Sequence, residues 1–206
     1  MKPIKSLLVL AIVCAPALAA AQGYYGGYGR PRSAVPGGFH DRTGRLTWGF
    51  AVGIGGMSDG GSTITTCVNC DFKPLAFEGD FHLGGMLSPR FGLMFEGQVN
   101  GQTVAADRFN GDTFLTQGAA MIAGQFWIIP QLWIKGGLGL ASLRVDDGVF
   151  VDDFGTGGAI MGAIGVELLS ARNFALELQG RVIEGTYNSL NDNITSGTIG
   201  FGINWY

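Results

Sequence analysis

The sequence has few charged residues and no cluster of basic ones. Lys, Arg, Asp and Glu make up 14% of its 206 residues, and the formal net charge is −3. Binding of nucleic acid needs a concentrated positive surface, so we expect no nucleic-acid partner. The chain also has no long hydrophobic run after residue 21, although 47% of its residues are hydrophobic. Such a chain buries its apolar residues in alternation, which indicates sheets rather than membrane helices.

Histidine is equally scarce, and this bears on enzymatic function. The chain has two histidines, His40 and His82. A serine nucleophile needs a histidine within hydrogen-bond reach. His40 lies in a segment without periodicity, and the predicted strands around His82 have no serine on the same face. We therefore predict that the protein is not an enzyme and has no catalytic residues and no cofactor.

Cysteine occurs three times, and two copies form a Cys-x-x-Cys pair, Cys67 and Cys70. A zinc site would need a second Cys or His pair, which the surrounding segment lacks, so we predict no metal site. An oxidising compartment favours a disulfide between Cys67 and Cys70, with free thiols as the alternative.

The amino terminus is typical of a secretory signal. Lys2 and Lys5 precede an apolar run over 7–13, and small residues follow up to Ala21. This layout predicts a signal peptide over 1–21. A retained membrane helix is one alternative, but the apolar stretch over 7–21 is too short and contains a proline. A lipoprotein signal acylated at Cys14 is the other, but Val13 stands where a small residue is needed.

Residues 22–45 follow the signal and are rich in Gly, Tyr, Pro and Arg without periodicity. The composition predicts a flexible periplasmic leader. The alternative is a contact segment for anionic headgroups or cell-wall polymer, formed by Tyr24, Tyr25, Tyr28, Arg30, Arg32, Arg42 and Arg45.

Residues 46–206 divide into eight alternating segments whose length suits tilted membrane-spanning strands. The segments are 46–57, 74–87, 91–103, 114–128, 132–145, 157–168, 174–184 and 195–206. Short connections alternate with longer polar ones, as in outer-membrane barrels with periplasmic turns and external loops. We therefore predict an all-β fold, an eight-stranded antiparallel up-and-down transmembrane barrel that forms one domain.

The two faces of these segments differ in chemistry. The predicted outer face is apolar and includes Trp48, Phe50, Val52, Ile54, Leu75, Phe77, Phe81, Leu83, Phe91, Leu93, Phe95, Val99, Ile134, Leu138, Leu140, Phe174, Leu176 and Leu178. The predicted inner face carries Glu78, Asp80, His82, Glu96, Gln98, Asn100, Gln117, Gln125, Lys135, Glu167, Glu177, Gln179 and Arg181. A soluble barrel shows the opposite pattern, so the surrounding solvent is predicted to be lipid.

The last segment is similar to the C-terminal assembly signal of outer-membrane barrels. A polar residue, a glycine and two alternating apolar positions precede the terminal tyrosine, at Thr198, Gly200, Ile203, Trp205 and Tyr206. Residues 46–206 resemble the small eight-stranded outer-membrane proteins, which include the OmpA transmembrane domain, OmpX, OmpW and opacity-type proteins. The resemblance implies an integral protein of the bacterial outer membrane, with outer-membrane lipid and the barrel assembly machinery as partners.

The second and third segments predict a hairpin whose register follows from its turn. If Leu87 faces Phe91, then His82 faces Glu96, at a distance that allows an ion pair between them. Similar arithmetic places Lys135 opposite Gln125. We predict a polar network that fills the lumen, formed by Glu78, Asp80, His82, Glu96, Gln98, Asn100, Lys135, Glu167, Glu177 and Arg181.

Two functions remain open at this point. The first is a structural or surface-interaction role in membrane integrity, adhesion or loop presentation to an external surface or host ligand. The second is a narrow pore or lateral-diffusion channel for small apolar solutes. The external loops are predicted to be acidic, which indicates either a solvated surface or a site for divalent cations.

Overall fold

The computed structural model describes residues 38–63, 75–107, 111–146, 151–171, 173–187 and 193–206. The predicted signal peptide, most of the leader, and the predicted Cys67–Cys70 disulfide lie outside these residues. Within them, no helix is long and apolar enough to cross a membrane.

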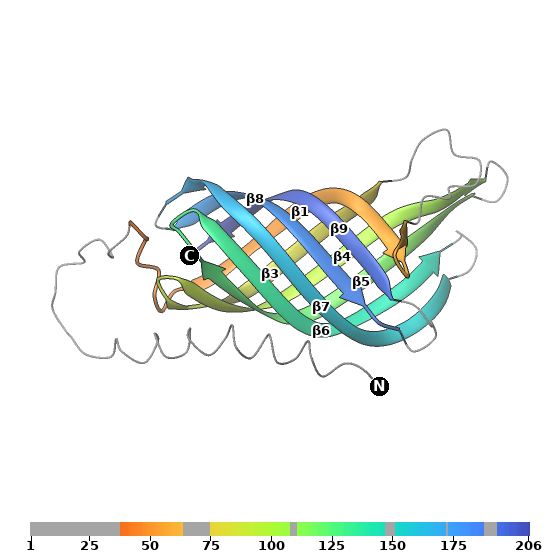
Figure 1. Ribbon diagram of the computed structural model, residues 1–206, viewed down its shortest axis with the longest axis horizontal. Coiled ribbons are helices and arrows are strands. Elements are labelled where there is room, and N and C mark those ends of the chain that lie inside the picture. Colours follow the sequence, from red (N-terminus) through yellow and green to blue (C-terminus); the bar gives the residue numbers. More distant parts are fainter. Residues whose placement is uncertain (1–37, 64–74, 108–110, 147–150, 172, 188–192) are drawn as a thin grey trace.

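Alternating apolar and small or polar residues produce nine strands joined in one sheet (Figure 1). The strands are β1 (Leu46–Asp59), β2 (Ser62–Thr63), β3 (Ala76–Ser88), β4 (Phe91–Asp107), β5 (Gly111–Trp127), β6 (Leu132–Asp146), β7 (Val151–Ser170), β8 (Phe174–Gly185) and β9 (Ile194–Trp205). β2 only folds back on the end of β1, through a turn at Gly60 and Gly61. Both glycines have a positive φ, as tight hairpin turns require.

The sheet closes into a barrel because β1 pairs with β9 as well as with β3. All neighbouring strands are antiparallel and, apart from β2, follow one another in chain order, which confirms the predicted eight-stranded up-and-down barrel. β4, β5 and β7 are longer than predicted. They continue as paired hairpins beyond the positions where the apolar alternation that guided the prediction has ended.

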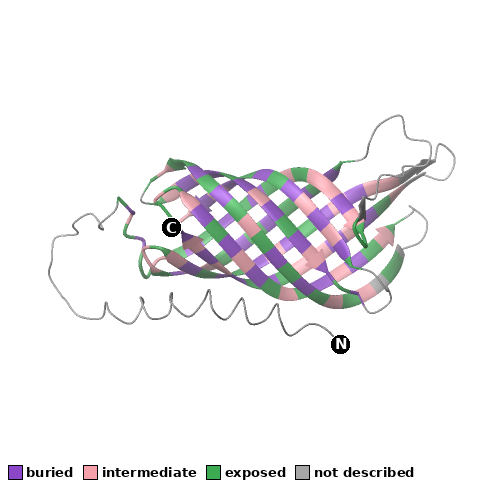
Figure 2. Ribbon diagram, viewed as in Figure 1, coloured by how far each residue is buried: buried purple, intermediate pink, exposed green. Residues whose placement is uncertain are grey.

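Apolar side chains cover the outside of the barrel, as predicted. Along β1, Trp48, Phe50 and Val52 are exposed, whereas Thr47 and Ala51 are buried. The same alternation runs along the other strands (Figure 2). An apolar exterior around a polar interior is the arrangement of a barrel that sits in lipid.

The β3–β4 hairpin has the predicted register, with His82 opposite Glu96. The premise of that prediction was wrong, because Ser88 and not Leu87 lies opposite Phe91. A bulge beside the turn takes up the extra residue, so the remaining pairs keep their positions.

The three short turns and both ends of the described chain lie at one end of the barrel, which we call the periplasmic end (Figure 1). A buried apolar cluster occupies it, with Tyr206 packed alongside Phe39, Met86, Trp127 and Trp133. A second cluster extends from the middle of the lumen to the opposite, outer end and includes Met57, Met94, Leu115, Met121, Leu143, Met161, Ile183, Tyr187 and Ile194. Sequence analysis assigned small and polar residues to the lumen and missed these clusters.

The last eight residues of the predicted leader are described by the structure. Residues 38–45 pack against the periplasmic end, where Phe39 is 6% exposed and Arg42 is 3% exposed. The flexible leader stays a prediction for residues 22–37, which lie outside the described residues.

Candidate functional site

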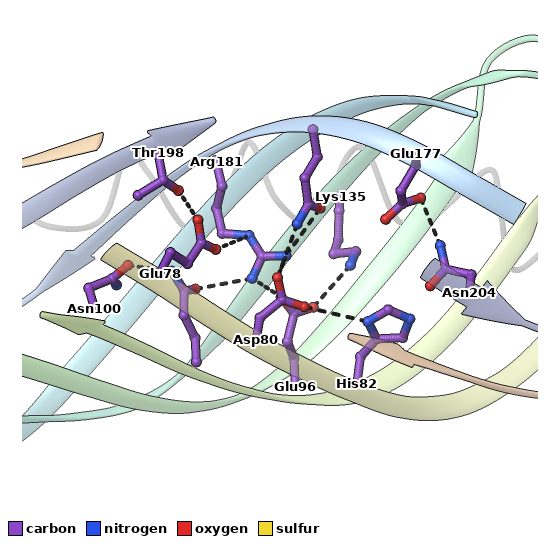
Figure 3. Close-up of polar contacts among 12 residues, drawn as sticks. Glu78, Asp80, His82, Glu96, Asn100, Lys135, Glu177, Arg181, Thr198 and Asn204 are labelled. Carbon is purple, nitrogen blue, oxygen red and sulfur yellow. Dashed lines mark hydrogen bonds and ion pairs between the residues drawn. The ribbon is translucent and has the colours of Figure 1, made fainter. Parts of the chain in front are cut away.

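Arg181 is the centre of the polar network inside the lumen. Its side chain extends from β8 across the lumen to β3 and β4 (Figure 3). The guanidinium contacts the carboxylates of Glu78 at 3.2 Å and Asp80 at 3.1 Å, and it also pairs with Glu96. Arg181 Nη1 further donates to Gln98 Oε1 at 3.2 Å. One side chain therefore ties together strands on opposite walls of the barrel.

Lys135 supplies the second cation of the network. Its Nζ atom lies 3.2 Å from Glu96 Oε2, and its position opposite Gln125 confirms the predicted pairing. Glu96 thus receives Lys135 on one oxygen and Arg181 on the other. The ammonium also lies 5.2 Å from the centre of the Trp133 ring.

His82 lies beside Asp80 and does not form the ion pair with Glu96 that the register allows. His82 Nδ1 lies 3.7 Å from Asp80 Oδ1, on the same face of the same strand. His82 and Glu96 are opposite each other, but both oxygens of Glu96 are already engaged by Lys135 and Arg181. Residues that lie opposite each other on paired strands are close in space. Whether they form an ion pair depends on the other charged groups within reach.

Neutral side chains complete this network. Thr198 donates to Glu78, Gln179 Nε2 donates to Asp80 Oδ2 at 3.0 Å, and Gln98 Nε2 donates to Asn100 Oδ1 at 3.3 Å. These bonds matter because a buried carboxylate needs several partners to offset its lost hydration.

Glu177 and Glu167 were predicted as members of the same network but have different partners. Glu177 Oε2 accepts from Trp133 Nε1 at 2.9 Å and from Asn204 Nδ2 at 2.7 Å (Figure 3 shows Asn204). Glu167 accepts from Trp127 Nε1 at 2.8 Å. Sequence analysis missed both tryptophans. Trp127 lies two residues after Gln125 on β5, and Trp133 lies two residues before Lys135 on β6, so the alternation of each strand points both rings inward.

Tyr187 follows β8 at the outer end of the lumen and is 4% exposed. Gln117 Nε2 donates to the Tyr187 hydroxyl at 2.8 Å and to the Ile194 carbonyl at 3.1 Å. Burial raises the pKa of Tyr187, and the hydrogen bond from Gln117 opposes that rise. The hydroxyl therefore stays protonated at neutral pH.

The predicted assembly-signal residues occupy both faces of β9 and the position after it. Thr198 and Gly200 point inward. Trp205 stacks on Trp48 of β1, with ring centres 4.3 Å apart. Tyr206 turns into the periplasmic mouth, where its hydroxyl donates to Glu167 at 3.2 Å. The terminal aromatic on the outer face is thus Trp205.

The chemistry available to this lumen is charge pairing and obstruction. Within the described residues, no group of three or more His, Cys, Asp or Glu side chains could hold a metal ion. The charged side chains face one another across the lumen.

Comparison with known proteins supports the fold. The sequence matches no protein-family model, and a search of curated proteins finds no match. Among solved structures, Neisserial surface protein A is 18% identical with a TM-score of 0.52, over 78% of this chain and 95% of that one. The Yersinia pestis attachment invasion locus protein, in complex with the heparin analogue sucrose octasulfate, is 10% identical with a TM-score of 0.50, over 78% and 99%. These likenesses confirm the predicted architecture.

Proposed function

We propose that this chain, which has the fold of the small eight-stranded outer-membrane barrels, is a closed scaffold that presents its outer loops to the cell's surroundings. The observation that carries the proposal is the placement of Arg181, whose guanidinium joins three carboxylates from two strands on the opposite wall. A solute passing through the lumen would have to separate these charges.

Separation of these charges is unfavourable because the pairs are almost completely buried. The side chains of Arg181, Glu78, Asp80 and Glu96 are each at most 2% exposed. Removing one partner from a buried pair leaves an uncompensated charge, which destabilises a protein by about 3–5 kcal/mol. The apolar clusters at both ends of the lumen oppose passage further.

The surface role is supported by the two structural neighbours, one named as a surface protein and the other solved with a heparin analogue. The outer end of this chain has its own charge character. Five acidic residues and one basic residue whose side chains the structure describes lie there, a net charge of −4, at Asp59, Asp146, Asp152, Asp153, Glu184 and Arg144. A cationic external partner fits this surface better than a polyanion does.

The test is conductance of the refolded protein in a planar bilayer. We expect no steady conductance from the unmodified barrel, with a general porin added afterwards to show that the bilayer reports open channels. Steady conductance from the unmodified barrel would overturn the closed scaffold and favour the narrow channel for small apolar solutes.

A further inference from the structure

Residues 38–45, which we call the strap, lie across the periplasmic mouth of the barrel and are fastened on both sides. On one side, the amide of Gly44 donates to the Met86 carbonyl at 2.8 Å, and the Met86 amide donates to the Arg45 carbonyl at 3.0 Å. On the other side, Arg45 Nη1 donates to Asn173 Oδ1 at 2.6 Å. The strap therefore joins the end of β3 to the β7–β8 turn.

Arg42 is the buried anchor of the strap. Its Nη1 and Nη2 atoms donate to the two oxygens of Glu167 at 2.9 and 3.1 Å. Nη2 also donates to the Ala171 carbonyl at 2.9 Å. The guanidinium lies over the Tyr206 ring, 3.6 Å from its centre. A two-point contact with a carboxylate and stacking on an aromatic ring are both specific to arginine.

The partners of Arg42 come from distant parts of the chain. Glu167 lies near the end of β7, and Tyr206 follows β9. Trp127, at the end of β5, donates to the same carboxylate that Arg42 binds. These groups meet only when β9 has paired with β1 and the barrel is closed, because β1 begins directly after the strap.

We infer that the strap locks the closed barrel: Arg42 joins the segment before the first strand to the residue after the last strand, through Glu167. The lock secures the seam between β1 and β9 at its periplasmic end. This inference is separate from the closed lumen proposed above. The closed lumen depends on Arg181, so it would remain closed to solutes even if the strap detached.

Arg42→Lys tests the lock by proteolysis, since lysine keeps the trypsin site and loses the two-point contact. In the refolded mature protein in detergent micelles, we expect cleavage after residue 42 to be about tenfold faster than in the unmodified protein, because the detached strap is open to protease. Arg144→Lys is the control. The Arg144 side chain is 61% exposed and lies near the outer end of β6, so we expect cleavage after Arg42 at close to the unmodified rate.

Unfolding kinetics give the second readout. A contact that forms only after closure affects the unfolding rate and leaves the folding rate unchanged. We expect Arg42→Lys to unfold several-fold faster in urea and to refold at the unmodified rate. Both variants are first shown to be folded by their gel shift on boiling. The inference would be overturned if Arg42→Lys were cleaved after residue 42 and unfolded in urea at the same rates as the unmodified protein. Equal effects of Arg42→Lys and Arg144→Lys would overturn it as well.

Discussion

Arg181 shows how much of the lumen depends on one side chain. Only a guanidinium has enough donors, in a planar fork, to contact the carboxylates of Glu78, Asp80 and Glu96 together. Lys135 adds a single point charge to Glu96. Because Arg181 and its carboxylates are buried, loss of one partner leaves a charge without compensation and lowers the stability of the barrel.

Replacing Arg181 with leucine is therefore expected to destabilise the barrel by about 3–5 kcal/mol, because three buried carboxylates lose their common partner. Arg144→Leu is the control. Its pair with Asp153 is 3.7 Å long and more than half exposed on both sides, and its loss is expected to change stability by about 0–1 kcal/mol. Urea unfolding in micelles measures both values. Equal changes in the two variants would contradict the central role of Arg181.

Tyr206 predicts a pH dependence at the periplasmic mouth. Burial raises its pKa well above 10, and the Glu167 carboxylate raises it further. A raised folded-state pKa means that this contribution to stability is complete below the unfolded-state pKa and is lost as pH rises toward the folded-state value. We expect the unmodified protein to lose more stability above about pH 10 than Tyr206→Phe does. The urea midpoint as a function of pH measures this, and parallel loss in both proteins would contradict the assignment.

At the scale of strands, the alternation of period two was enough to predict which residues face lipid. Trp48, Phe50 and Val52 follow it, as do the buried charges of β3. Strand ends were less predictable, because the outer extensions of β4, β5 and β7 are held by hairpin pairing and lack the regular alternation of apolar and polar residues.

The lumen was predicted only in part, for a physical reason. Inward parity identified Arg181 and its carboxylates, but parity does not say which partner His82 takes among several near neighbours. The buried role of Arg42 could not be predicted either. Its partners Glu167 and Tyr206 are far away in sequence, and the composition around Arg42 is typical of a flexible segment.

Two glycines on β9 test the seam of the barrel. A Cβ atom added at Gly200 would lie 2.5 Å from the Val52 carbonyl oxygen, whereas nothing lies within 4 Å of one added at Gly197. We expect Gly200→Ala to push β9 away from β1 and to destabilise the barrel by about 1–3 kcal/mol. Gly197→Ala, the matched control on the lipid-facing side, is expected to change stability by less than about 0.5 kcal/mol. A tolerated Gly200→Ala in the same unfolding assay would show that the seam is looser than described.

The molecule as a whole is asymmetric along its axis. Acidic residues gather at the outer end, while the described exposed residues at the periplasmic end include Arg90 and Asp41.

We expect the refolded barrel not to be retained on immobilised heparin at physiological salt, because like charges repel. An uncharged matrix of the same kind is the control for non-specific retention. Retention on heparin that is lost at high salt would show that residues outside the described part supply a cationic surface, and would overturn the preference for a cationic partner.

The positions of the four tryptophans make the protein its own optical probe. Trp48 and Trp205 stack on the lipid side, whereas Trp127 and Trp133 are at most 2% exposed and donate to carboxylates inside the lumen. Brominated lipids quench only indoles that they touch, so they should remove the emission of the first pair and leave that of the second. The remaining emission then reports on the lumen alone. Loosening of the buried cluster at the periplasmic end, which contains Trp127 and Trp133, can thus be followed in a bilayer of brominated lipid, without any label on the protein, as a change in the remaining emission.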